Sequence, residues 1–362
     1  MSILSQVMSV SVGKRANTQE DAKDEIVSAA KKTRVYERHV FTTQEELQTA
    51  IRNLEYYRER YGPICSWDVS NITEKHVFAT KKELQSAIHM YEEDRDNLYG
   101  PIGSWDVSNI TDMSYLFEGY EIFNESLADW DVSHVTDMHG MFYRCFKFNQ
   151  PLHTWNVSNV RDMNRMFYVC PAFNQPLHTW NVSNVTDMYG MFYKCTAFNQ
   201  SVHTWNVSNV VNMNGMFQGC IAYNQPVHTW NVSNVRDMGC MFHTCTEFNQ
   251  PLDTWNVSNV RDMMGMFIGC IAFNQPLHTW NVSNVTHMIA MFGKCTEFNQ
   301  PLHTWNVSKV DEMGNMFLDC CSFCNDVSAW VQQNPSLKDK GSLIFTGDCQ
   351  QRDFGGIDYF CK

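Results

Sequence analysis

The sequence has no excess of basic residues. It carries 27 Lys and Arg against 39 Asp and Glu, a formal net charge of −12. Proteins that bind nucleic acid present a basic surface to the phosphates, so this balance excludes a general nucleic-acid binder. It also disfavours adsorption to an anionic membrane surface. No window approaches the ~18 consecutive apolar residues of a membrane-spanning helix, and we expect no membrane span.

The N-terminal segment lacks the charge order of a secretory signal. Within residues 1–34 a short apolar stretch precedes the charged residues, whereas a signal peptide places its charges first. We therefore expect no signal peptide and an intracellular, cytoplasmic location, with association with a virus particle as the alternative. Fourteen cysteines would ordinarily suggest disulfides, but a reducing compartment and their placement in the repeat argue against them, and we expect the cysteines at 25-residue spacing to be free thiols.

Motifs of enzyme active sites are also missing. The sequence contains no phosphate-cradling glycine loop, no dinucleotide fingerprint and no nucleophile elbow. Pairs of residues that look catalytic are copies of one repeat position, and an active site does not need eight copies. We predict that the protein is not an enzyme and has no catalytic residues, no cofactor and no bound metal.

What the sequence does have is a 25-residue repeat. Tryptophan recurs at this spacing ten times, at Trp105, Trp130, Trp155, Trp180, Trp205, Trp230, Trp255, Trp280, Trp305 and Trp330. A representative unit is PLHTWNVSNVRDMNRMFYVCPAFNQ, residues 151–175. Its apolar residues Met163, Met166, Phe167 and Cys170 fall at i, i+3, i+4 and i+7, which predicts a short amphipathic helix.

The other residues of the unit predict a strand, a loop, a cap for the helix and a turn. Asp162 precedes the predicted helix and suits an N-cap. Trp155 and Val157 alternate with polar neighbours, which predicts a short strand buried on one face. A single unit buries too little apolar surface to offset the ordering of 25 residues, so neighbouring units must stack. The sequence therefore predicts an α/β repeat solenoid.

A family resemblance follows from these repeats. The string WDVSNITDMSYLF (Trp105 to Phe117) and the FNQPLHTWNVSNV-type units resemble BspA-like leucine-rich-repeat proteins, and most closely the Mycoplasma surface proteins with the W-D-V-S-x-V-T-D-M-x-x-M-F signature. The resemblance covers residues 41–330. It implies a leucine-rich-repeat-like stack and a binding role, as in bacterial surface and adhesion proteins, with similar proteins in algae, protists and large DNA viruses. It implies no catalytic residues.

Two longer units precede the regular repeats. In each, a threonine is followed three residues later by glutamate, at Thr43 and Glu46 and at Thr80 and Glu83, which is the spacing of a helix capping box. The apolar residues of 84–91 share one helical face. We expect these units to cap the stack, because a bare terminal unit would expose its apolar face. The predicted organisation is a polar tail at 1–38, a helical N-terminal cap at 39–104, the solenoid at 105–330 and a C-terminal cap at 331–362.

Variation between repeats suggests where a partner would bind. The predicted strand face repeats Thr-Trp-Asn-Val-Ser almost unchanged, whereas the predicted helix side varies. The candidate binding residues on that side are Asn164, Arg165, Tyr168, Tyr189, Tyr193, Lys194, Asn214 and Met264. A recognition module would bind a protein or glycan partner through these positions or through the caps. In the alternative, the chain is a structural rod or shell component of a particle that associates with copies of itself.

Several repeated polar positions can be interpreted either as a metal or disulfide site or as structural residues. The cysteines at 25-residue spacing, from Cys145 to Cys320, are interpreted as reduced core residues, with disulfides or a metal array as the alternative. The histidine row beginning at His153 is interpreted as a solvated or half-buried polar row, with metal ligation as the alternative. The aspartate row that includes Asp162 is interpreted as helix caps, with bridging calcium as the alternative. Cys321 and Cys324 form a C-x-x-C pair whose downstream partners are poorly spaced for zinc.

Overall fold

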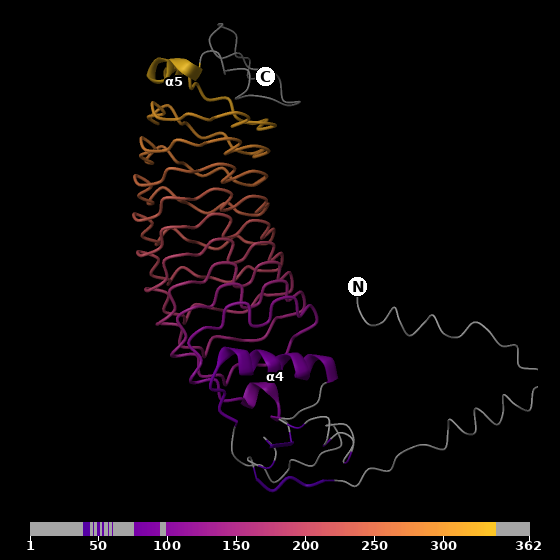
Figure 1. Cartoon of the computed structure of the whole chain (residues 1–362). Helices are drawn as coiled ribbons and strands as arrows, with labels where there is room; N and C mark the ends of the chain where they lie inside the picture. Colours follow the sequence, from indigo (N-terminus) through magenta and orange to yellow (C-terminus); the bar gives the residue numbers. More distant parts are fainter. Residues whose placement is uncertain are drawn as a thin grey trace, which may run out of the picture. The chain divides into compact units, whose positions relative to one another are not determined.

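The computed structural model describes residues 76–94 and 99–337, together with 39–43 and single positions between 46 and 60. The chain divides into two compact units, residues 1–73 and 74–362. The second unit consists of stacked 25-residue turns of chain, with helices at its two ends (Figure 1). We call each turn a rung, and residues 25 apart in successive rungs a column.

Helix α4 (Lys81–Asp94) begins the second unit. Its predicted apolar face is confirmed, because Leu84, Ala87 and Ile88 are buried in the same core as the first rung. The ring of Tyr91 meets that of Trp105 edge to face at 5.9 Å. The short helix η3 (Ile102–Ser104) then leads into the rungs.

The predicted capping residues start their helices. The Glu83 N–H donates to Thr80 Oγ1 at 3.2 Å, and the Glu83 carboxylate accepts from the Ala79 N–H at 3.0 Å. In the first unit the Glu46 N–H likewise donates to Thr43 Oγ1 at 3.1 Å. The glutamate reaches one residue further back than in a standard capping box, but it satisfies an exposed amide in the same way.

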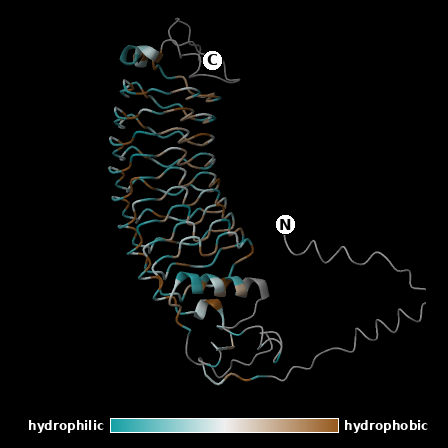
Figure 2. Ribbon diagram, in the orientation of Figure 1, coloured by the Kyte–Doolittle hydropathy of each residue, from teal (hydrophilic) through white to brown (hydrophobic). Residues whose placement is uncertain are grey.

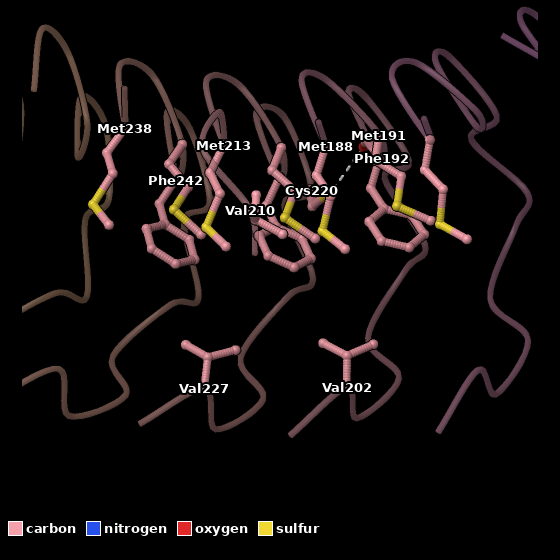
Figure 3. Packing of buried hydrophobic residues seen from close by; sticks show 14 of the residues in the cluster. Met188, Met191, Phe192, Val202, Val210, Met213, Cys220, Val227, Met238 and Phe242 are labelled. Carbon is pink, nitrogen blue, oxygen red and sulfur yellow. Dashed lines mark hydrogen bonds between the residues drawn. The ribbon is translucent and has the colours of Figure 1, made fainter. Parts of the chain in front are cut away.

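The rungs stack in register through identical side chains. Trp155 lies parallel to Trp180 with ring centroids 6.5 Å apart, and Phe167 lies parallel to Phe192 at 5.7 Å. Figure 3 shows the same order in the methionine, phenylalanine and valine columns of the core. Hydrophilic and hydrophobic residues alternate around each rung, so one apolar core runs through the stack (Figure 2). The predicted 25-residue solenoid is confirmed.

The predicted helix at residues 163–170 is wrong. The N–H groups of Met163, Arg165, Phe167 and Val169 donate to carbonyls of the next rung at 2.7–3.2 Å. Only intervening N–H groups, such as that of Met166, donate to a carbonyl three residues back in their own rung. An α-helix would instead satisfy every N–H four residues back. The same apolar spacing therefore occurs in a chain whose N–H groups bond alternately to the next rung and within their own rung.

Two left-handed residues in each rung explain this difference. Arg165 has φ 54° and Val169 has φ 58°, and the equivalent residues in the other rungs also have positive φ. Left-handed backbone is unstrained only for glycine, and glycine often occupies these columns, for example at Gly190 and Gly219. These residues turn the chain out of the helical path twice, and this frees alternate N–H groups for the next rung.

The predicted strand and helix cap are also wrong. Trp155 and Val157 are buried as predicted, but the residues around them form turns and no strand. The parallel pairing lies in the Asp162 column instead, where Asp137, Asp162 and Asp187 form successive isolated bridges. Asp162 Oδ1 accepts from the N–H two residues later at 2.8 Å, so it closes a tight turn and caps no helix.

Buried side chains also bond one rung to the previous one. Trp155 Nε1 donates to the Leu127 carbonyl at 2.9 Å, and Cys170 Sγ donates to the Phe142 carbonyl at 2.9 Å. Both bonds recur down their columns with a separation of 28 residues. The cysteines from Cys170 to Cys295 in this column are buried thiols, as predicted. This bond explains why cysteine recurs in successive rungs of this column, because each thiol satisfies a buried carbonyl.

The last rung is closed by helices α5 (Ala329–Gln333) and η4 (Pro335–Leu337). Gln333 Oε1 accepts from the Val307 N–H at 3.0 Å. Asn334 Nδ2 donates to the carbonyls of Val307 and Val310 at 3.2 and 2.8 Å. These amide groups join the C-terminal helices to the backbone of the last complete rung. None of the helices in the described ranges is long and apolar enough to cross a bilayer.

Candidate functional site

The candidate residues lie on one side of the rungs, which we call the variable face. It comprises the columns of Asn164, Arg165, Tyr168 and Val169. The residues that fill these columns change from rung to rung, while the neighbouring columns of Met166 and Phe167 stay buried and nearly constant. The turn geometry explains why substitutions collect here, since these side chains alternate with core side chains and point away from the core.

Three tyrosines form a stack on the variable face. Tyr143 and Tyr168 lie 4.8 Å apart with their rings 2° from parallel, and Tyr168 and Tyr193 lie 4.2 Å apart at 4°. Burial, followed by the neighbouring tyrosines, raises the pKa of Tyr168 to about 12. The hydroxyl therefore stays neutral near pH 7. Because the rings cover one another, the stack presents ring edges and hydroxyl groups to a partner.

Two cations lie against these rings. The Arg165 guanidinium carbon is 4.7 Å from the centroid of the Tyr189 ring and 5.9 Å from that of Tyr168. Partial burial works against the charge on Arg165, but bonding to Tyr189 and Tyr115 outweighs it and the pKa is raised. Lys194 Nζ lies 5.4 Å from the Tyr193 ring centroid. Cation–π contacts of this kind hold the heads of long side chains in place.

The structure brings six of the eight candidate residues together and separates two. Asn164, Arg165 and Tyr168 lie in one rung, and Tyr189, Tyr193 and Lys194 lie in the next. Asn164 Oδ1 is buried and makes no hydrogen bond with any residue that the structure describes.

The other two candidates have different surroundings. Asn214 Nδ2 donates to both carboxylate oxygens of Asp237, at 3.1 and 3.3 Å, so this side chain has a structural role. Met264 is 40% exposed but lies three rungs, or ~14 Å, beyond Lys194. Ile268 and Ile289, in the same and the next rung, are half-buried.

The sequence reasoning missed four residues of the same cluster. Tyr143 extends the tyrosine stack, and Arg144, the next residue along the chain, is exposed with its guanidinium carbon 5.8 Å from the Phe146 ring centroid. The Tyr115 hydroxyl bonds His139 Nε2 at 2.8 Å, and their rings lie 4.7 Å apart. The 25-residue period gave the signal, because Tyr143 precedes Tyr168 by one repeat. We name the cluster from Tyr115 to Lys194 the tyrosine–arginine patch.

The aspartate column runs along the edge of the variable face. Burial, followed by the charges of Asp137 and Asp187, raises the pKa of Asp162 above its usual range, although the Asn164 N–H lowers it. Asn212 interrupts the column of carboxylates, and its side-chain Nδ2 donates to Asp187 Oδ2 at 3.3 Å. The charge on Asp162 therefore opposes the fold, and an asparagine in this column can donate to a neighbouring carboxylate instead.

The remaining polar positions have these surroundings. Members of the histidine column, such as His153 and His178, are exposed, as predicted. Cys321 is disulfide-bonded, so the expectation of cysteines without disulfides is wrong at this position, and Cys321 is not available as a thiolate ligand. Cys349 and Cys361 lie outside the described residues. Within the described ranges, no three His, Cys, Asp or Glu side chains gather as metal ligands would.

The stacked rungs and the columns of identical side chains define a repeat solenoid with rungs of 25 residues. The profile of the family described as "Mycoplasma protein of unknown function, DUF285" matches residues 85–192, 175–267 and 251–346. These overlapping matches cover well over half of the chain, which therefore belongs to this family. A comparison with curated proteins found no match.

Proposed function

We propose that the protein is a non-enzymatic recognition module that binds a protein partner through the variable face. The observation that supports this most directly is the tyrosine–arginine patch. Tyrosine and arginine are enriched where protein interfaces gain most of their affinity, because they combine large contact areas with few rotatable bonds or several fixed donors. Here the half-buried rings are already ordered by stacking, so little rotamer entropy remains to be lost on binding.

Backbone strain supports the same proposal. Arg165, Val169 and Lys194 occupy left-handed positions at which other rungs place glycine. Each non-glycine residue there costs on the order of 1 kcal/mol of folding stability. A fold selected for regularity alone would favour glycine in these columns. The resemblance to BspA-like leucine-rich-repeat proteins agrees with a binding role and belongs to this proposal.

The chain itself supplies variants that test the proposal without disturbing the fold. Arg165→Gly places at this position the residue found at Gly140 and Gly190, and Tyr168→Gln copies Gln218 from its own column. The tagged full-length protein and the double variant would be used to capture partners from the native source. We expect a partner recovered at fixed stoichiometry with the parent to be lost with the variant.

A matched control changes an exposed column outside the variable face. His178→Asp copies Asp253, which occupies the same column in another rung. This control should retain the partner. Equal recovery with the parent and the double variant would refute binding through the variable face, and a loss with His178→Asp as well would place the contact elsewhere.

A second candidate function is a structural rod or particle component. The exposed columns of His153, Thr154 and Asn156 repeat with little change, so they offer a regular surface for copies of the chain. Sedimentation velocity of the purified protein over a range of concentrations tests this function. Concentration-dependent assembly that His178→Asp weakens would favour the rod, and a monomer at all concentrations would count against it.

A further inference from the structure

The tyrosine–arginine patch differs in charge from the rest of the chain. Between Met138 and Phe148, Met163 and Phe173, and Met188 and Phe198 there is no acidic residue, although the chain carries 39 Asp and Glu. The same segments contain four of the 27 basic residues, Arg144, Lys147, Arg165 and Lys194. The preceding segment, which holds Tyr115, contains Glu118 and Glu121. Of the equivalent segments in the following rungs, 213–223 and 263–273 carry no charge, 238–248 and 288–298 each contain a glutamate, and 313–323 contains an aspartate. The excess of basic residues is therefore confined to three rungs.

Within the described part of the chain, these four cations are not neutralised by ion pairs. Among the described residues, none of them lies within ion-pair distance of a carboxylate. The half-buried aspartate column adjoins the patch, but the strongest attractive charge acting on Asp162 comes from His139 rather than from Arg165. Arg144, Lys147 and Lys194 are exposed residues. The Arg144 guanidinium carbon lies 5.8 Å from the ring centroid of Phe146, and Lys194 Nζ lies 5.4 Å from that of Tyr193. These cations are available to an anionic group of a partner.

From these observations we propose that the tyrosine–arginine patch binds an acidic segment of the protein partner. This inference rests on the proposed recognition function and specifies its ligand. Arg165 is the central contact, since its guanidinium is held over Tyr189 at 4.7 Å and has its fork of donors already oriented. A planar guanidinium fixed in this way matches a carboxylate with two parallel hydrogen bonds.

The stacking of the tyrosines favours a peptide over a sugar or a nucleic-acid base. Sugars and bases bind aromatic residues through the ring faces. In the stack, the faces of Tyr168 are covered by Tyr143 and Tyr193 at 4.8 and 4.2 Å. The ring edges and hydroxyl groups remain to bond backbone carbonyls and carboxylates. The three basic rungs span ~10–15 Å along the axis, which an extended peptide covers with about four or five residues.

The test measures fluorescence anisotropy of a labelled oligoglutamate peptide with the full-length protein, at low and at physiological salt. We expect binding that weakens with salt and exceeds that of the matched oligoglutamine peptide. Arg165→Gly and Lys194→Gly should each weaken binding about tenfold, as loss of one charge-assisted contact does. Neither variant should lower the melting temperature, because glycine suits the left-handed backbone at both positions.

Lys294→Gly is the matched control. Lys294 is an exposed lysine in the same column as Lys194, with φ 60°, but it lies four rungs away and outside the patch. Its removal should leave the affinity unchanged. An equal loss with Lys294→Gly would overturn the proposal, because binding would then follow overall charge. Equal affinity for the glutamate and glutamine peptides would also overturn it.

Two further outcomes separate this inference from the proposed function. Stronger binding of a sulfated polysaccharide such as heparin than of oligoglutamate, with the same loss in Arg165→Gly, would replace the peptide by a polyanionic glycan. If Arg165→Gly with Tyr168→Gln abolishes capture of the native partner while oligoglutamate does not bind, the recognition function stands and the acidic ligand is wrong.

Discussion

Replacing Asp162 by asparagine should stabilise the protein near neutral pH. Asp162 lies between Asp137 and Asp187 in a column of parallel bridges, so like charges face it from both sides. Asparagine keeps the oxygen that accepts the Asn164 N–H at 2.8 Å. It also adds a donor toward a neighbouring carboxylate, as Asn212 provides for Asp187 at 3.3 Å.

The size of the effect follows from the column geometry. Bridged residues are ~4.8 Å apart, and two unit charges at that separation repel by about 0.9 kcal/mol in water. Two neighbours and partial burial of Asp162 increase this repulsion, whereas salt and the half-exposed position reduce it. The N–H of Asn164 also loses a charged acceptor. We expect a net stabilisation of about 1 kcal/mol at pH 7.

The pH dependence gives the sign of the effect. The pKa of Asp162 is raised by burial and then by its neighbours, so the folded state holds the proton more tightly than the unfolded state does. The free-energy cost that the charged Asp162 carboxylate adds to folding is therefore full above the folded pKa and declines as the pH falls through that pKa. It is absent below the unfolded value of about 3.9, where both states are protonated.

Urea unfolding of the parent and of Asp162→Asn at pH 7 and near pH 3 measures this difference. The variant should unfold at higher urea at pH 7, and the two midpoints should converge near pH 3. Asp253→Asn, at an exposed position in the histidine column, is the control and should show no shift. If Asp162→Asn is destabilised at both pH values, the charged acceptor of the Asn164 N–H matters more than the repulsion, and the reasoning is refuted.

Three other substitutions and one chemical assay test the packing and backbone strain of individual columns. Tyr223→Phe should raise the free energy of unfolding by about 1–2 kcal/mol, because its buried hydroxyl has no hydrogen-bond partner among the described residues and its column otherwise holds phenylalanine; an unchanged or lower urea midpoint would show that the hydroxyl is satisfied. Val169→Gly should stabilise and Gly219→Val should destabilise, each by about 1 kcal/mol, since both positions have positive φ; thermal melts with shifts of the same sign would contradict the strain argument. Burial raises the pKa of the thiols from Cys170 to Cys295, so iodoacetamide should label them at least about tenfold more slowly in the folded than in the denatured chain. Equal labelling rates, followed by mass spectrometry, would indicate an open core.

Much of the candidate site could be predicted from the sequence, because the period places residues 25 apart in one column. Variation against a constant background located Arg165, Tyr168 and Tyr193 on one face. The sequence could not show that Arg165 lies over Tyr189 or that Asn214 is engaged by Asp237. Those contacts join neighbouring rungs and depend on the rotation of each side chain in the stack.

The same division applies to the fold. The amino-acid sequence by itself determined the repeat length, the order of the units and the side chains that enter the core, since burial in a solenoid must recur with the chain's own period. It did not determine the backbone of residues 163–170. A spacing of i, i+3, i+4 and i+7 places the same side chains inward in a helix and in the observed turns.

Only the tertiary structure decided between these two conformations. The N–H of Arg165 reaches the Tyr189 carbonyl at 2.8 Å, a partner that exists only when the next rung is in place. With neighbours on both sides, the left-handed turns satisfy every second amide between rungs and align the aromatic ladders. A short helix would have satisfied its amides internally and left the rungs without these bonds, so it is the stack that selects the backbone.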